Sequence, residues 1–109
     1  MSPVAQFAAL ADPTRCRVVE LLHERPRPVH ELAAAFSISR PAISRHLRVL
    51  KEAALVREEK QGRENVYSLQ RRQLEPLTAW LKQHSGVYQA VRKVPAADSR
   101  PAPQMEFEL

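Results

Sequence analysis

The sequence predicts a mainly α-helical fold with one small β-hairpin, in the order α-α-α-α-β-β-α. Apolar residues recur every three or four positions over most of residues 4–53, which is the spacing of one helix face. Apolar and polar residues alternate over 55–60 and 64–69, as they do in half-buried strands. Two helix starts are also marked, by Asp12-Pro13 and by Ser39. These patterns favour short helices packed with one antiparallel ribbon.

The first two predicted helices lie before a pair of closely spaced prolines. The first helix carries the apolar repeat Val4, Phe7, Ala8 and Leu10. Asp12 then follows as an N-cap, with Pro13 at the first helical position, where its missing N–H costs nothing. The second helix has its own apolar repeat and ends before Pro26, which cannot continue it.

A third and a fourth helix follow, with a tight turn between them. The third occupies residues 29–36, with Leu32, Ala33 and Phe36 on one face. Residues 37–39 form the turn, and Ser39 caps the fourth helix. On a helix over residues 39–53, the residues of one narrow apolar stripe are Ile43, Leu47 and Leu50.

The second half of the chain is expected to hold the hairpin and a last helix. The hairpin covers residues 55–69, with Gly62 in its turn. The last helix begins near residues 72–74 and runs to about residue 93. Residues 1–93 are therefore predicted to form one domain, and 94–109, which contain three prolines and little periodicity, a flexible tail.

Composition indicates a polyanion as the partner. The formal net charge is +5 and the pI about 10.0, and the tail is net acidic, so the rest is more basic than the whole. No signal-peptide core and no apolar run of about 18 residues is present. The single cysteine cannot form an internal disulfide. We therefore expect a cytoplasmic protein with no membrane partner.

The predicted fourth helix concentrates positive charge on its exposed side. Residues 37–51 contain no acid but include the basic residues Arg40, Arg45, Arg48 and Lys51. At 100° per residue, Arg45 and Arg48 lie opposite the apolar stripe, with Ser44 on the flank. Such a helix fits the DNA major groove, where Arg can pair with guanine. This predicts a helix-turn-helix with recognition helix 39–51 and the hairpin as a wing; a merely solvated charged face is the alternative.

Three segments, FAALADPTRCRVVELL, VHELAAAFSISRPAISRHLRVLKEAALV and GRENVYSL, resemble the ArsR-type (ArsR/SmtB) family of winged helix-turn-helix bacterial repressors over roughly residues 4–92. The resemblance implies a homodimer through the first and last helices that binds an inverted-repeat operator and represses its own operon. Relatives often have Gly where this chain has Ala54, so a positive φ there would mean strain or a different turn. With Arg48 added from helix geometry, the expected DNA-binding residues are Ser39, Arg40, Pro41, Ser44, Arg45, His46, Arg48, Lys60 and Arg63.

Many relatives sense metals, but their ligands are missing here. The third helix, VHELAAAF, has alanines in place of a Cys-x-Cys pair, and the last helix offers His84 without a paired ligand. We expect no metal and no cofactor. Cys16 stands between Arg15 and Arg17, so it is either an inert residue or a redox-reactive thiol. His46, at the edge of the apolar stripe, either contacts DNA or packs.

The last helix carries a heptad-type apolar stripe that favours pairing of two subunits. The expected dimer-interface residues are Phe7, Leu10, Leu74, Leu77, Trp80, Leu81 and Tyr88. Packing of this stripe on the subunit's own body is the alternative. Two other functions remain open: a winged-helix module for protein–protein interaction, and a thiol-responsive repressor acting through Cys16. No Ser/His/Asp order, Gly-rich phosphate loop or metal set indicates an enzyme.

Overall fold

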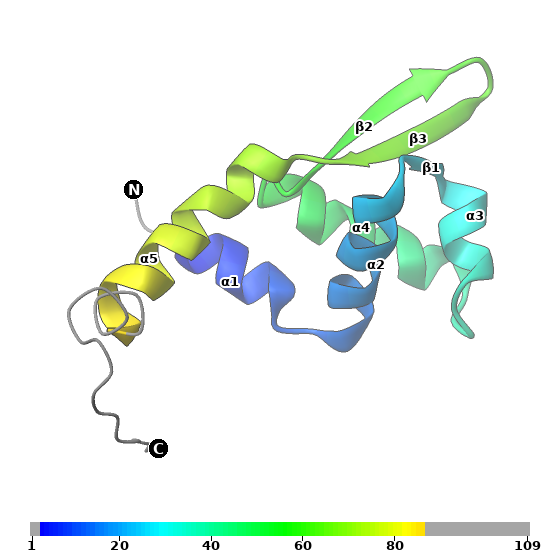
Figure 1. Ribbon diagram of the computed structural model, residues 1–109. Coiled ribbons are helices and arrows are strands. Elements are labelled where there is room, and N and C mark those ends of the chain that lie inside the picture. Colours follow the sequence, from blue (N-terminus) through cyan, green and yellow to red (C-terminus); the bar gives the residue numbers. More distant parts are fainter. Residues whose placement is uncertain (1–2, 87–109) are drawn as a thin grey trace. The chain divides into compact units, whose positions relative to one another are not determined.

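The computed structural model describes residues 3–86, so the predicted tail lies outside the described residues. Residues 3–77 belong to one compact unit and residues 78–86 to a second. Figure 1 shows the elements α1 (Val4–Leu10), α2 (Pro13–Glu24), β1 (Arg27–Pro28), α3 (Val29–Ala34), α4 (Arg40–Glu52), β2 (Val56–Gln61), β3 (Glu64–Leu69), the 3₁₀ helix η1 (Arg71–Leu74) and α5 (Glu75–Ser85). The mainly helical class is confirmed. None of the described helices has the length and apolar character needed to cross a membrane.

Both predicted N-caps are confirmed. The Asp12 carboxylate accepts a hydrogen bond from the backbone N–H of Arg15 at 3.0 Å, at the start of α2. The Ser39 hydroxyl accepts one from the backbone N–H of Ala42 at 3.2 Å, at the start of α4. Each cap satisfies a helix N–H that has no partner within the helix. The start of α4 is therefore set by its own sequence.

The sheet has three strands, and the expectation of a hairpin alone was incomplete. β1 pairs antiparallel with β3, and the strand order is β1-β3-β2. The proline segment before α3, expected only to stop a helix, thus forms an edge strand. Pro28 fits there because an edge strand leaves one side without ladder hydrogen bonds. The pairing ties the connection between α2 and α3 to the middle of β3.

The helix α3 ends two residues earlier than predicted. The backbone N–H groups of Ala35 and Phe36 donate to carbonyls only three residues back, those of Leu32 and Ala33, at 3.1 and 3.3 Å. This tighter pattern closes the last turn of a helix. Phe36 is still partly buried and packs against the core, as its apolar spacing predicted.

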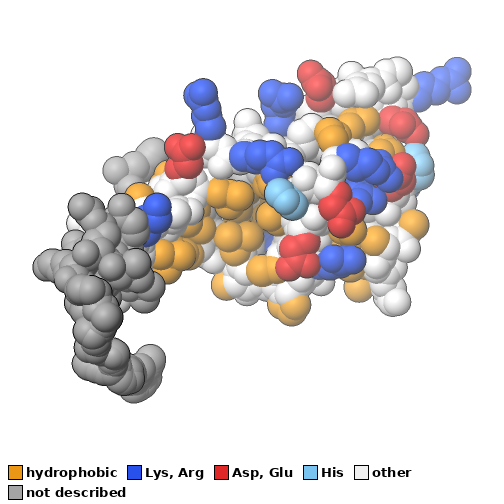
Figure 2. All heavy atoms as spheres, viewed as in Figure 1, with side chains coloured by type: hydrophobic (Ala, Val, Ile, Leu, Met, Phe, Trp, Pro, Cys, Tyr) orange, Lys and Arg blue, Asp and Glu red, His pale blue; other side chains and the backbone are white. Residues whose placement is uncertain are grey.

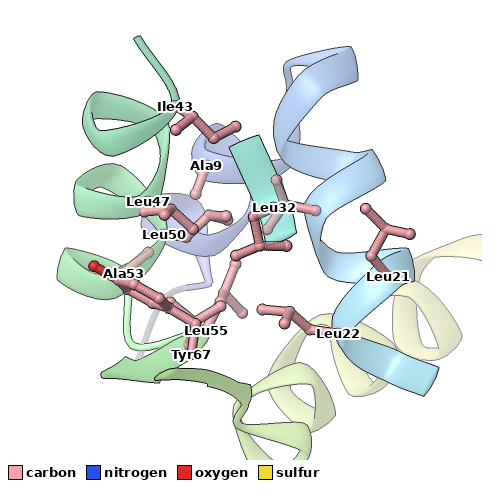
Figure 3. Packing of buried hydrophobic residues seen from close by; sticks show 12 residues of the cluster. Ala9, Leu21, Leu22, Leu32, Ile43, Leu47, Leu50, Ala53, Leu55 and Tyr67 are labelled. Atoms are coloured by element: carbon pink, nitrogen blue, oxygen red, sulfur yellow. The ribbon is translucent and has the colours of Figure 1, made fainter. Parts of the chain in front are cut away.

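The apolar stripe of α4 lies at the centre of the core. Ile43, Leu47 and Leu50 each expose 0% of their surface, which confirms the stripe predicted from their spacing. Figure 3 shows them facing apolar side chains from α1, α2, α3 and the strands; the core also includes Ala9, Val18, Leu21, Leu22, Leu32, Leu55, Val56 and Tyr67. Full burial of one such leucine contributes about 1.5–3 kcal/mol. The opposite face of α4 is thereby held outward.

Ala54 ends α4 in the left-handed conformation, with φ +63°. The backbone N–H of Leu55 donates to Leu50 and that of Ala54 to Lys51, at 3.0 and 2.9 Å. This pair of bonds is a Schellman motif, which normally takes glycine at the left-handed position. The sequence-based concern about this position was correct, because the turn does require a positive φ.

Candidate DNA-binding surface

The outward face of α4 carries the side chains that the sequence assigned to DNA. Ser44, Arg45 and Arg48 are exposed, opposite the buried stripe. Ser39, Arg40 and Pro41 are also exposed, at the start of the helix. The helix has 13 residues, which corresponds to about 20 Å at 1.5 Å per residue. Its exposed face therefore combines guanidinium and hydroxyl groups along a rod that fits the major groove.

Most of the cations on this surface are not neutralised. Among residues 3–86, no ion pair or side-chain hydrogen bond involves the basic side chains of Arg40, Arg45, Arg48, Lys60 and Arg63. Lys51 differs from this set and corrects the expectation of a helix without local neutralisation. Its ammonium group lies 2.8 Å from the carboxylate of Glu58 on β2. Lys51 thus joins α4 to the wing instead of adding free charge.

The pairing of Lys51 and Glu58 also involves the central strand. The hydrogen bond from Lys51 is the main reason that the pKa of Glu58 is lowered, with a further contribution from Tyr67. Tyr67 lies opposite Glu58 in the ladder of β2 and β3. Burial, followed by the negative charge of Glu58, raises the pKa of Tyr67 to about 12. The three side chains hold the recognition helix and the wing together.

The wing turns through two residues, Gly62 and Arg63, because Gln61 and Glu64 are still paired. Gly62 has φ +66°, and a glycine in the first position of a two-residue loop is typical of a type II′ turn. Lys60 and Arg63 flank this turn and are exposed. In Figure 2, Lys and Arg side chains stand out from the surface where Figure 1 places the tip of the hairpin.

His46 is not on the open face of α4. Its side chain is 24% exposed, and its Nδ1 atom lies 3.2 Å from the guanidinium of Arg15 and 3.8 Å from the carboxylate of Asp12. Of the two alternatives for His46, this geometry favours packing. The pKa of Asp12 is lowered chiefly by the backbone N–H of Arg15, with smaller contributions from the charges of His46 and Arg15. Sequence reasoning missed Arg15, because no local pattern reveals a contact 31 positions away.

Cys16 is half-buried. Its thiol donates to the carbonyl of Leu10 at 2.9 Å. The guanidinium of Arg15 is directed to other acceptors, and that of Arg17 to Glu20. The structure therefore does not bring the two neighbouring cations onto the sulfur. Among the described residues, no three His, Cys, Asp or Glu side chains gather in a way that could hold a metal ion.

The residues assigned to a dimer interface differ in exposure. Leu77 is buried, with 6% exposed, and Leu10 and Leu74 pack partly against the core of the first unit. Phe7 is half-buried. In the second unit, Trp80 and Leu81 expose 43% and 50% of their surface. Tyr88 lies outside the described residues.

The fold and the exposed cationic helix together define a winged helix-turn-helix protein, with α3 and α4 as the helix pair and β2–β3 as the wing. Comparison with known proteins agrees. The model of the bacterial regulatory protein family arsR matches residues 12–58. The chain is 32% identical to the crystal structure of RHA00566, an ArsR family transcriptional regulator, with a TM-score of 0.72, over 78% of this chain and 93% of that one.

Two curated relatives extend this comparison. The chain is 48% identical to the transcriptional regulator Rv2034 of Mycobacterium tuberculosis over 68 residues, and these residues make up 62% of this chain and 64% of that protein. It is 35% identical to the transcriptional repressor SdpR of Bacillus subtilis over 75 residues, and these residues make up 69% of this chain and 83% of that protein. The chain belongs to the ArsR family of bacterial regulatory proteins. Its match spans less than two thirds of Rv2034.

Proposed function

We propose that this chain is a DNA-binding transcriptional regulator, most simply a repressor of its own operon, and we assign it no enzymatic activity. The observation that carries the proposal is the set of exposed, unneutralised cations on α4 and the wing, described above for residues 3–86. Like charges held together on one surface repel one another, and a polyanion removes that repulsion while releasing its own counterions. Membership of a family of bacterial regulatory proteins supports the same conclusion.

The proposed complex places α4 in the major groove. There Arg45 and Arg48 can each form a bidentate contact to guanine, and Ser44 can donate to or accept from a base. Ser39, Arg40 and Pro41, at the start of the helix, would lie beside the phosphates. Lys60 and Arg63 on the wing would contact the backbone or the adjacent minor groove, where they add affinity more than sequence preference.

We further propose that the functional unit is a homodimer formed by α1 and α5, bound to an inverted repeat. This dimer is supported by the exposed apolar residues Val4, on α1, and Trp80 and Leu81, on α5. Exposed apolar surface of this kind is stabilised when another subunit buries it. Leu77 is already buried within the subunit, so we assign it a smaller part in the interface. Two-fold symmetry would set the two recognition helices about 34 Å apart, one turn of DNA.

Charge reversal on α4 tests the proposal. The double variant Arg45→Glu/Arg48→Glu should lose binding to the duplex that the wild-type protein enriches from a randomised DNA pool, with an unchanged melting temperature. Arg72→Glu is the matched control, because Arg72 is also exposed but lies on η1, away from the proposed surface. Wild-type binding by the double variant would refute the assignment. A wild-type protein that enriches no duplex from the pool would instead favour the protein–protein interaction module.

A further inference from the structure

The helix α1 is connected to the recognition helix at two points within the first unit. Gln6, on α1, donates its side-chain amide to the backbone carbonyl of Ala53 at the C-terminal end of α4, at 2.9 Å. Arg15, on α2, donates to the carbonyls of Ala9 and Ala8 at the end of α1, at 2.6 and 3.5 Å. The same guanidinium group reaches the ring of His46 on α4. One connection therefore holds the end of α4 and the other its middle.

The contacts of Arg15 require the fixed, planar arrangement of N–H donors that a guanidinium group provides. Its Nε and Nη2 atoms point to α1 while Nη1 points to α4, so one guanidinium group spans three helices. A positive charge is also favoured beside carbonyls at the C-terminal end of a helix. Lysine would keep the charge but would lose the fixed geometry of the donors, so it could not hold both helices.

We propose that Arg15 and Gln6 are positioning residues for DNA recognition: they fix the orientation of α4 relative to α1, and hence the direction in which the arginines of α4 meet the bases. This inference rests on the proposed function. Neither side chain lies on the exposed face of α4, and both donate to acceptors inside the first unit. Loss of either should therefore disturb base contacts, which need accurate geometry, more than contacts to phosphates, which depend mainly on charge.

The contact from Arg15 requires Nδ1 of His46 to act as the acceptor, so it is made with one tautomer of the ring. The carboxylate of Asp12 lies 3.8 Å from the same nitrogen.

The test compares Arg15→Lys and Gln6→Ala with wild-type protein. The measured quantity is the ratio of affinities for the duplex enriched from a randomised pool and for a random duplex of equal length, at several salt concentrations. In both variants the ratio should fall by about tenfold, the size of one lost bidentate base contact, while the salt dependence stays unchanged. Arg17→Lys is the control, because Arg17 is exposed on the same helix and, among residues 3–86, pairs only with Glu20.

Each result distinguishes the positioning role from the function on which it rests. If Arg15→Lys and Gln6→Ala keep the wild-type ratio, the positioning role is wrong. If Arg15→Lys does not fold, Gln6→Ala alone decides, since it removes one amide from a partly exposed site. A wild-type protein whose binding does not depend on salt would instead count against DNA binding itself.

Discussion

Replacing Ala54 by glycine should stabilise the junction between the recognition helix and the wing. A left-handed conformation costs an L-residue about 1–2 kcal/mol, and Ala54 adopts it, with φ +63°. Glycine removes this cost but gives the unfolded chain more freedom, which costs about 0.5–1 kcal/mol. The expected gain in the free energy of unfolding is the difference, about 0.5–1 kcal/mol. It corresponds to a rise of about 2–8 °C in melting temperature.

The assay is thermal unfolding followed by circular dichroism at one fixed protein concentration, since assembly makes the melting temperature depend on concentration. The matched control is Ala53→Gly, one residue earlier, where φ is −84° and the side chain is only 6% exposed. That variant should be less stable, by about 0.5–1 kcal/mol or more. Strain at Ala54 would be contradicted if Ala54→Gly melted at or below the wild-type temperature, or if both variants shifted in the same direction.

Three further predictions concern the wing, the core and the tyrosine at their junction. Lys60→Ala should weaken binding to all duplexes alike and reduce the slope of log K against log salt by about 1 for each copy of the side chain; an unchanged slope would remove Lys60 from the phosphate contacts. Leu47→Ala should lower the free energy of unfolding in urea by about 2–5 kcal/mol, because it leaves a cavity in the core, and a loss below about 1 kcal/mol would contradict its burial. In a Tyr88→Phe variant, ultraviolet titration of Tyr67 should give a pKa of about 12, and Glu58→Gln should move it toward the ordinary value. Because the folded state holds the hydroxyl proton of Tyr67 more tightly, the contribution of Tyr67 to stability is complete below pH 10 and is lost as pH rises toward 12. A titration midpoint of Tyr67 at pH 10 would contradict its packing.

The recognition helix could be predicted from sequence because its signals are local. Ser39 caps it, and Ile43, Leu47 and Leu50 repeat at helical spacing, so the buried face, and with it the exposed cationic face, followed directly. The positive φ of Ala54 was anticipated from the resemblance to the family. For the helix itself, the relevant information lay within a few residues of each position concerned.

The features that sequence missed depend on contacts between distant residues. A two-residue strand such as β1 has no periodicity of its own, and only its partner, β3, defines it. Lys51 seemed unpaired because Glu58 lies beyond the turn at the end of α4. Arg15 was considered only as a neighbour of Cys16, whereas its guanidinium reaches two other helices. Such pairings appear only once the helices are packed.

Sequence-specific binding through the cationic surface is tested by the salt dependence of wild-type binding to a duplex enriched from a randomised pool, measured beside a random duplex of equal length. If Arg40, Lys60 and Arg63 of two subunits each neutralise one phosphate, log K should fall against log salt with a slope of about −5, and the enriched duplex should bind more tightly throughout. A slope near zero, or equal affinity for both duplexes, would contradict a sequence-specific role for the cationic face of α4.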